Sequence, residues 1–167
     1  MLKAFLTLCL TMLLLTITYG QQNEGTQEKV VFKSNTEFSM QLETALSSET
    51  NKVGDDVNFV LTEEINSDGN KLEKGSVVYG RIVNVQKISE KNDTAKVCIM
   101  FDFIKKGDQF ISIVAAITEI TPNVEAIKFA ASPTYSGGTT LSLKGKEIQL
   151  DKGRIFHVKL IKDVTAE

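Results

Sequence analysis

The residues best suited to chemistry are few and scattered. His157 is the only histidine of the chain and so the first candidate for a general base. It lies in an alternating, strand-like stretch, and no serine or cysteine phrase typical of a nucleophile site accompanies it. A lone histidine in such a stretch is more often a surface residue or one whose hydrogen bonds the fold satisfies. The sequence therefore predicts no catalytic residue and a non-enzymatic protein.

Acidic pairs offer a second kind of chemistry, because carboxylate oxygens are the ligands that calcium prefers. Asp55-Asp56 and Glu63-Glu64 are such pairs, and the phrase NSDGNKLE resembles a calcium loop. Its glycine, however, stands at the fourth position of the phrase rather than the sixth. Residues Gly137 to Thr140 resemble a glycine-rich loop that binds phosphate. Because no lysine and no helix follow directly, we expect a flexible loop there instead. We interpret the carboxylates as solvated turn residues and predict no metal and no cofactor.

The first twenty residues have the organisation of a signal peptide. Lys3 is their only charged residue, the run from Ala4 to Thr18 is apolar apart from threonines, and small residues precede Gln21. A membrane anchor is the competing interpretation, but the run is shorter than the roughly 20 apolar residues of a spanning helix. We expect an exported protein, periplasmic or extracellular, with no membrane span after cleavage. Cys98 then remains as the only cysteine, and we expect it to be a small buried hydrophobe.

Composition limits the other possibilities. The formal net charge is −2 and no block of lysine or arginine stands out, which argues against nucleic acid as a partner. Residues 21–33 begin with the polar phrase QQNEGTQE and are expected to form a flexible N-terminal arm that leads into the first strand. Residues 34–167 have the length of one domain.

Alternation of apolar and polar residues is the strongest structural signal, and it predicts an all-β chain. It is clearest in these stretches: Phe38 to Leu42, Val57 to Leu61, Val77 to Val85, Val97 to Phe103 and Phe110 to Ile120. The last stretch is apolar on both faces, as expected for a strand covered on both sides. Asn66 to Asn70 and Lys105 to Asp108 have the composition of hairpin turns.

One phrase recurs: LEKGSVVYGRI (72–82) returns as LDKGRIFHVKL (150–160) and, more loosely, as FKSNTEFSMQL (32–42). Gly75, Gly153 and Asn35 then coincide, and these are residue types that tolerate left-handed backbone. Each copy predicts an apolar residue, a turn or bulge, and an alternating strand. Coincidence is the alternative, because the sequences of strands and turns are repetitive by nature. Repeated bends curl a sheet, so we predict a small closed or nearly closed barrel of short strands, sealed by strands 36–43 and 154–161.

The order of these phrases resembles the C-terminal β-barrel domain of the TrbI family, the outer-membrane channel subunit of type IV secretion and conjugation machines. Three phrases carry the resemblance: SNTEFSMQLETALSS, VGDDVNFVLTEEI and DGNKLEKGSVVYGRI. Further matches are Lys74-Gly75-Ser76 with Gly80, and a closing strand with Gly153, Val158, Asp163 and Val164. The resemblance covers most of residues 34–164 and implies a minimal stand-alone barrel, without the family's membrane helix or pore hairpin.

The family inserts its pore hairpin where this chain has Thr121 to Gly138. A hairpin that crosses ~30 Å of hydrocarbon needs roughly 40 residues, so we do not expect a pore. We expect one long loop or a short helix around 121–138, with a surface that contacts a partner. The predicted contact residues are Val124, Ile127, Phe129 and Tyr135.

The sequence thus favours a secreted cell-envelope β-barrel module that binds a protein or glycan partner or assembles with itself. The alternative is a small hydrolase or ligand-binding barrel whose polar site is assembled from residues far apart in the sequence.

Overall fold

The computed structural model describes residues 29–67, 69–122 and 126–166, and these residues form strands and turns without a helix. The expected signal peptide (1–20) and residues 21–28 of the expected arm lie outside the described residues. The strands are β1 (Lys29–Phe32), β2 (Glu37–Leu42), β3 (Leu46–Ser47), β4 (Asp56–Leu61), β5 (Ile65–Ser67), β6 (Asn70–Leu72), β7 (Val77–Gln86), β8 (Thr94–Lys106), β9 (Gln109–Ser112), β10 (Ala115–Thr121), β11 (Lys128–Ala131), β12 (Thr139–Lys144), β13 (Gln149–Leu150), β14 (Ile155–Leu160) and β15 (Val164–Ala166).

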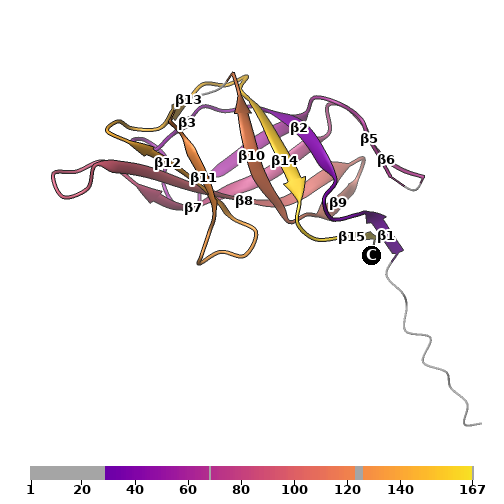
Figure 1. Cartoon of the computed structure of the whole chain (residues 1–167). Helices are drawn as coiled ribbons and strands as arrows, with labels where there is room; N and C mark the ends of the chain where they lie inside the picture. The colour runs from indigo at the N-terminus through magenta and orange to yellow at the C-terminus, as the bar shows by residue number, and fades with distance from the viewer. Residues whose placement is uncertain (1–28, 68, 123–125, 167) are drawn as a thin grey trace, which may run out of the picture.

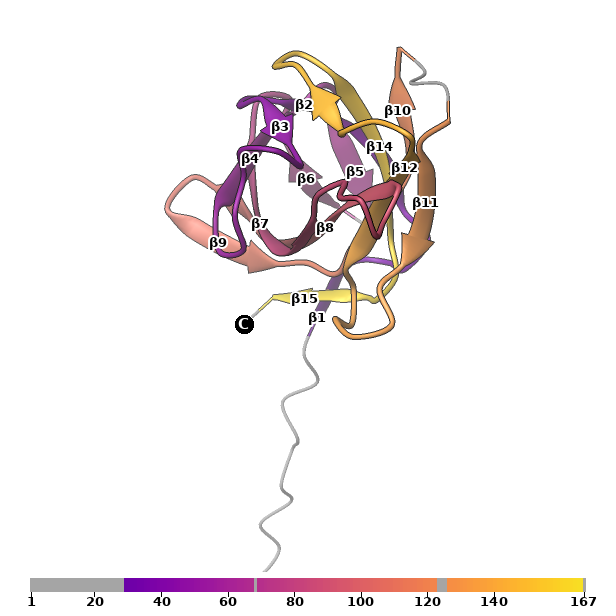
Figure 2. The ribbon, with the colours of Figure 1, turned by 90° about the vertical axis from the view of Figure 1, so that its left-hand side faces the viewer.

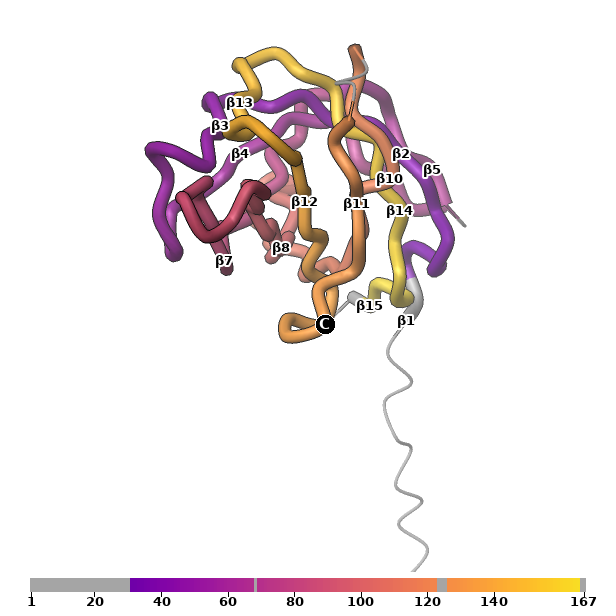
Figure 3. The backbone as a smooth tube through the Cα atoms, turned by 60° about the vertical axis from the view of Figure 1, so that its left-hand side comes forward, coloured from indigo at the N-terminus to yellow at the C-terminus, as the bar shows by residue number. Residues whose placement is uncertain are grey.

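One antiparallel sheet contains most of these strands, in the order β10-β14-β2-β4-β7-β8-β12-β11, with β9 paired to β8. The sheet curls into a nearly closed barrel, which Figure 2 shows end-on. Its two edge strands, β10 and β11, run alongside each other in Figure 3. The all-β barrel that the sequence predicts is therefore confirmed. Within the described residues, no helix is long and apolar enough to cross a membrane.

The recurring phrase is a structural unit. Asn35, Gly75 and Gly153 all have positive φ, at 69°, 87° and 94°. Each lies in a turn closed by a backbone hydrogen bond, and each stands two residues before the strand that its unit contributes to the barrel. Gly54, with φ 95°, begins a fourth unit before β4 that the recurring phrase does not reveal.

Each of these residues is the first residue of a β-bulge. The N–H of Gly153 donates to Leu42 O (2.8 Å), and the N–H of Leu42 donates back to Arg154 O (2.8 Å). This exchange, with a left-handed residue at the first position, is the bulge that glycine favours. The same exchange joins Asn35 to Leu160, Gly75 to Leu61 and Gly54 to Ile82.

These bonds explain the repetition, because the units hold one another in pairs. In each unit, the residue seven positions after the bulge residue exchanges the two backbone hydrogen bonds with the bulge of the other unit. The unit of β2 is joined in this way to that of β14, and the unit of β4 to that of β7. The residues at that position are all buried: Leu42, Leu61, Ile82 and Leu160.

Three of these four residues are followed, four positions later, by a second buried residue, in the phrases LETAL, LTEEI and LIKDV. Those second residues begin β3, β5 and β15, which turn away from the barrel to form small two-stranded sheets.

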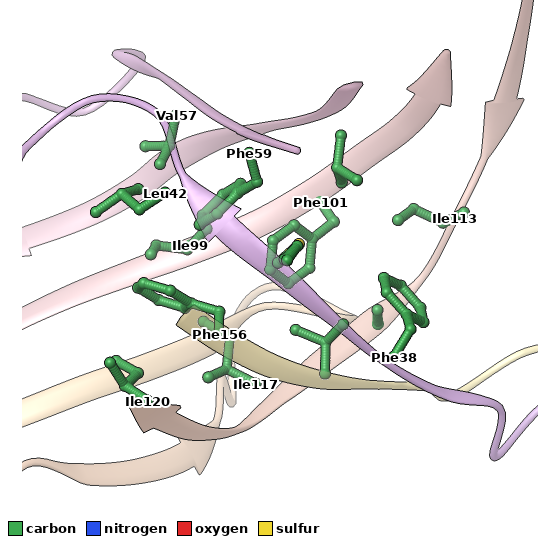
Figure 4. Close-up of a cluster of buried hydrophobic side chains, with 14 of the residues drawn as sticks. Phe38, Leu42, Val57, Phe59, Ile99, Phe101, Ile113, Ile117, Ile120 and Phe156 are labelled. Carbon is green, nitrogen blue, oxygen red and sulfur yellow. The ribbon is translucent and has the colours of Figure 1, made fainter. Parts of the chain in front are cut away.

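The inward-facing side chains fill the barrel. Strands β2 and β4 bury every second residue, and Phe59 stacks edge-on against Phe101 and Phe156 at 5.6 and 5.1 Å between ring centroids. Figure 4 shows these rings directed at one another from different strands. Cys98 is buried as expected.

The barrel closes at a place that the sequence does not indicate. Strands β2 and β14 do pair, as expected, but they lie inside the sheet rather than at its ends. The seam runs between β10 and the β11–β12 hairpin, where the buried Thr139 accepts a hydrogen bond from the N–H of Ile117 (3.0 Å).

Other local expectations are also corrected. Residues 29–32, the end of the segment expected to lead into the first strand, are themselves strand β1. The long stretch Phe110 to Ile120 divides into β9 and β10, and Phe110 is 60% exposed rather than covered. Thr139 and Thr140 begin β12 instead of a flexible loop, because Thr139, Leu141 and Leu143 alternate as buried residues. Within the expected loop or helix at 121–138, residues 128–131 are a strand.

Candidate functional site

Residues of β1, β9 and β15 line a cleft of about 530 Å³. Figure 1 shows these three strands at its right-hand side. This volume falls within the range of ligand-binding pockets, about 300–1,000 Å³. We call it the edge cleft. It is lined by Val31, Phe32, Asn70, Lys106, Gln109, Phe110, Ile111, Ser112, Val114, Lys162, Asp163 and Thr165.

The edge cleft exists because two strands diverge. Strand β10 pairs with β14 along its length, and the N–H of Ile161 donates the last bond of this ladder to Val114 O (2.9 Å). Beyond it the chain turns away to pair with β1, since Val164 is buried opposite Phe32. Asp163 fixes this turn by accepting the N–H of Ser34 (2.7 Å). The outer edge of β9 is thus not hydrogen-bonded to a second strand among the described residues, although β15 passes close to it.

The backbone of β9 alternates between its partner and the cleft. It pairs with β8 through the two-residue turn Gly107-Asp108, and Ile113 continues the ladder with a bond to Asp102 O (3.1 Å). Gln109 and Ile111 have the same parity as Ile113, so their N–H and C=O groups face β8. Those of Phe110 and Ser112 therefore face the cleft. No backbone hydrogen bond joins β9 to β15 among the described residues.

Side-chain donors predominate around the edge cleft. Lys106 and Lys162 are exposed on its rim, and neither forms an ion pair with a described residue. Asp163 is the only carboxylate among the described residues of the lining, and one of its oxygens already accepts the Ser34 amide. Asn70 adds an Nδ2 group that is buried without a hydrogen-bond partner among the described residues. Such an orphan donor costs about 1–3 kcal/mol.

An aromatic cluster adjoins the edge cleft on the outer face of the barrel. Phe110 meets Phe103 edge-on, with ring centroids 4.9 Å apart, and Phe103 packs against Tyr79 at 4.8 Å. The exposed ring of Phe110 belongs to both the cluster and the cleft. Exposed aromatic residues beside a concave surface are typical of protein-binding sites.

His157 lies elsewhere, on the outer face of β14, in a shallow depression of about 220 Å³. Its Nδ1 is 2.9 Å from Ser39 Oγ, and its Nε2 is 3.1 Å from Thr121 Oγ1. The Ser39 N–H donates to a Glu63 carboxylate oxygen (3.0 Å) and so does not point at a forming oxyanion. The arrangement joins β2, β10 and β14 through side chains, and its geometry is that of a cross-strand hydrogen-bond network.

The acidic pairs bind groups of the protein itself. Asp55 accepts the backbone N–H of Lys52 and, second, the side-chain amide of Asn51, and these bonds hold the pKa of Asp55 below its ordinary value of 3.8. Hydrogen bonding to Lys71, then to Asn66, lowers the pKa of Glu64 in the same way. No set of three potential metal ligands gathers within the part of the chain that the structure describes.

The contact residues predicted from the sequence lie at the barrel seam, away from the lining of the edge cleft. Ile127 and Phe129 are half-buried and pack against the core, and Tyr135 is half-buried in the turn before β12. Val124 is outside the described residues. The structure brings Ile127 and Phe129 to one strand region but unites none of them with the cleft.

Sequence reasoning missed the edge cleft, because its lining comes from distant parts of the chain. One partial signal was present: QFIS, four residues without a charge, follows a two-residue Gly-Asp turn, which is a hairpin pattern but does not show that the second strand is an edge. The chain matches no protein-family profile and no curated protein sequence.

Proposed function

We propose that the chain is an exported, non-enzymatic β-barrel module of the cell envelope that binds a protein partner through the edge cleft. Export rests on the signal-peptide pattern of residues 1–20. An envelope role accords with the resemblance of residues 34–164 to the TrbI barrel, here as a stand-alone module.

The unpaired edge of β9, beside an exposed aromatic ring, is the observation that carries the proposal. Folded proteins usually protect such edges, because an open strand edge recruits other chains. Here the edge is short and is flanked by Lys105 and Lys106, which limits indiscriminate pairing. A selective protein contact is the use that fits this arrangement.

A hydrolase is the competing function, and Ser39 beside His157 is the observation in its favour. A serine nucleophile needs donors for the oxyanion and a base that a third group orients. In this site Glu37 and Glu63 line the depression, and their negative charges oppose an oxyanion. The binding module is the better-supported function.

Photo-crosslinking in the producing cells tests the proposal. The photoreactive residue p-benzoylphenylalanine replaces Phe110 in one protein, Phe129 in a second and Lys146, in the turn between β12 and β13, in a third. We expect a discrete adduct with one partner protein from position 110 and none from position 146. An adduct from position 129 alone would transfer the binding surface to the 121–138 segment, and the absence of adducts from all three would contradict the binding function.

A further inference from the structure

We propose that the edge cleft takes an extended, acidic peptide segment of its partner, which adds to β9 as a new antiparallel or parallel strand. This inference rests on the proposed function and specifies the chemistry of the ligand. Peptides that add to a sheet edge gain main-chain hydrogen bonds from the edge and specificity from alternate side chains.

The backbone of β9 supplies the first part of the recognition. The N–H and C=O groups of Phe110 and Ser112 face the cleft, while those of Gln109 and Ile111 are used by β8. A strand laid about 4.8 Å from β9 would satisfy them. Because the outward carbonyl of Val114 is already bonded to Ile161, the added strand has to end at that point.

The side chains around the edge determine the charge of the ligand. Lys106 from β8 and Lys162 from the β14–β15 turn are the free cations of the described lining, and Gln109, Thr165 and Asn70 are neutral. The single carboxylate of that lining, in the turn before β15, is engaged by a backbone amide. Complementary charge therefore favours carboxylates at alternate positions of the bound segment. The exposed ring on β9 provides an apolar surface for a side chain between them.

A second copy of this chain fits the edge cleft less well. It would offer its own β9, whose residues Gln109 to Ser112 carry no carboxylate to meet the rim lysines. Pairing two such edges would therefore leave Lys106 and Lys162 of both copies without a carboxylate partner from the added strand. The charge pattern thus selects a different, acidic chain.

The probe is a phage-displayed library of random peptides of about eight residues, a length that covers a short edge strand. The library is selected against the purified protein, and the binding of the enriched peptides is then measured by fluorescence anisotropy.

Two sets of variants test the two parts of the recognition. Ser112→Pro removes a cleft-facing N–H and leaves the ladder to β8 intact, whereas Ser112→Ala keeps that N–H and is the matched control. Lys106→Glu with Lys162→Glu reverses the charge of the rim. Lys91→Glu with Lys146→Glu is its control, since both lysines are exposed and have no ion pair among the described residues.

We expect the enriched peptides to be acidic with apolar residues at alternate positions. Ser112→Pro and the rim reversal should each weaken their binding by about tenfold, and the controls should not. Melting curves verify that Ser112→Pro is folded, and the rim reversal tests the charge independently of it.

No enrichment, enrichment of basic or neutral peptides, or equal binding by Ser112→Pro and Ser112→Ala would overturn the inference. A dimer in light scattering that Ser112→Pro alone dissociates would assign the cleft to a second copy and also overturn it. If adducts still form at position 110, the proposed function stands while the ligand chemistry fails.

Discussion

At the scale of single residues, the bulge positions determine how the strands begin. Left-handed backbone costs an ordinary L-residue about 1–2 kcal/mol, whereas glycine adopts it freely and asparagine tolerates it. Gly54, Gly75 and Gly153 have room for an added Cβ, so the expected penalty of a substitution is conformational rather than steric. This separates the bulge glycines from Gly80, where a Cβ would lie 2.8 Å from Met100 O.

Replacing Gly75 or Gly153 by valine should therefore lower the free energy of unfolding by more than about 1 kcal/mol, because a β-branched residue strongly disfavours positive φ. Gly75→Asn should cost less, since asparagine occupies the equivalent position 35. Urea denaturation measures each value. Valine variants as stable as the asparagine variant would show that these positions do not require left-handed backbone.

The turn before β4 depends on a charged residue and should respond to pH. The pKa of Asp55 is lower in the folded protein than its ordinary value of 3.8, chiefly through the Lys52 N–H and then the Asn51 amide. A group with a depressed folded pKa contributes stability above its unfolded pKa and loses it as the pH falls through the folded pKa. Asp55→Ala should thus lower the melting temperature at neutral pH, and the difference from wild type should shrink below pH 3.8. A difference that is constant across this range would exclude the carboxylate as its cause.

At the scale of elements, the barrel seam relies on one side chain where the two edge strands lack a regular ladder. Thr139 of β12 is buried, and its hydroxyl accepts the Ile117 N–H of β10. Thr139→Val keeps the shape but removes the acceptor, which leaves a buried N–H unsatisfied at a cost of about 1–3 kcal/mol. Thr139→Ser retains the oxygen and is the control.

We expect Thr139→Val to lose stability and to exchange the Ile117 amide hydrogen faster than Thr139→Ser does. Hydrogen exchange followed by nuclear magnetic resonance resolves this amide. Equal exchange in the two variants would mean that the seam is held by packing of Ile117 and Leu141 rather than by this bond.

At the scale of the whole molecule, the sequence is sufficient to predict the barrel and insufficient to predict its opening. Alternation identifies β2, β4, β7 and β8, and the recurring phrase locates three of the four bulges, because both signals are local. The seam and the edge cleft depend on which distant strands meet. Residues 110–120 resemble one covered strand, since Ile113, Ala115 and Ile117 are buried, but β9 and β10 have different partners. No local pattern marks the point after Ile161 at which the chain leaves β10 to pair with β1.

The site is predicted least well for the same reason. Ile127 and Phe129 suggest a contact surface because they are apolar in a stretch without clear periodicity, yet both pack against the core. Their partial burial comes from their place on and beside the edge strand β11, which the sequence does not show. The apolar neighbours of Phe110 indicate an interior position, although its strand pairs with β8 and leaves its ring exposed.

The outward edge of β9 is free of backbone hydrogen bonds among the described residues and, in the proposed function, binds the partner. Amide hydrogen exchange of successive residues along β9 is the most direct test of both statements. In the free protein, Phe110 and Ser112 should exchange fast, while Gln109 and Ile111, bonded to β8, should be protected. Adding a bound acidic peptide should slow Phe110 and Ser112 and leave Phe129 unchanged. Protection of Phe110 and Ser112 in the free protein, or new protection at Phe129 instead, would contradict an open edge that binds the partner.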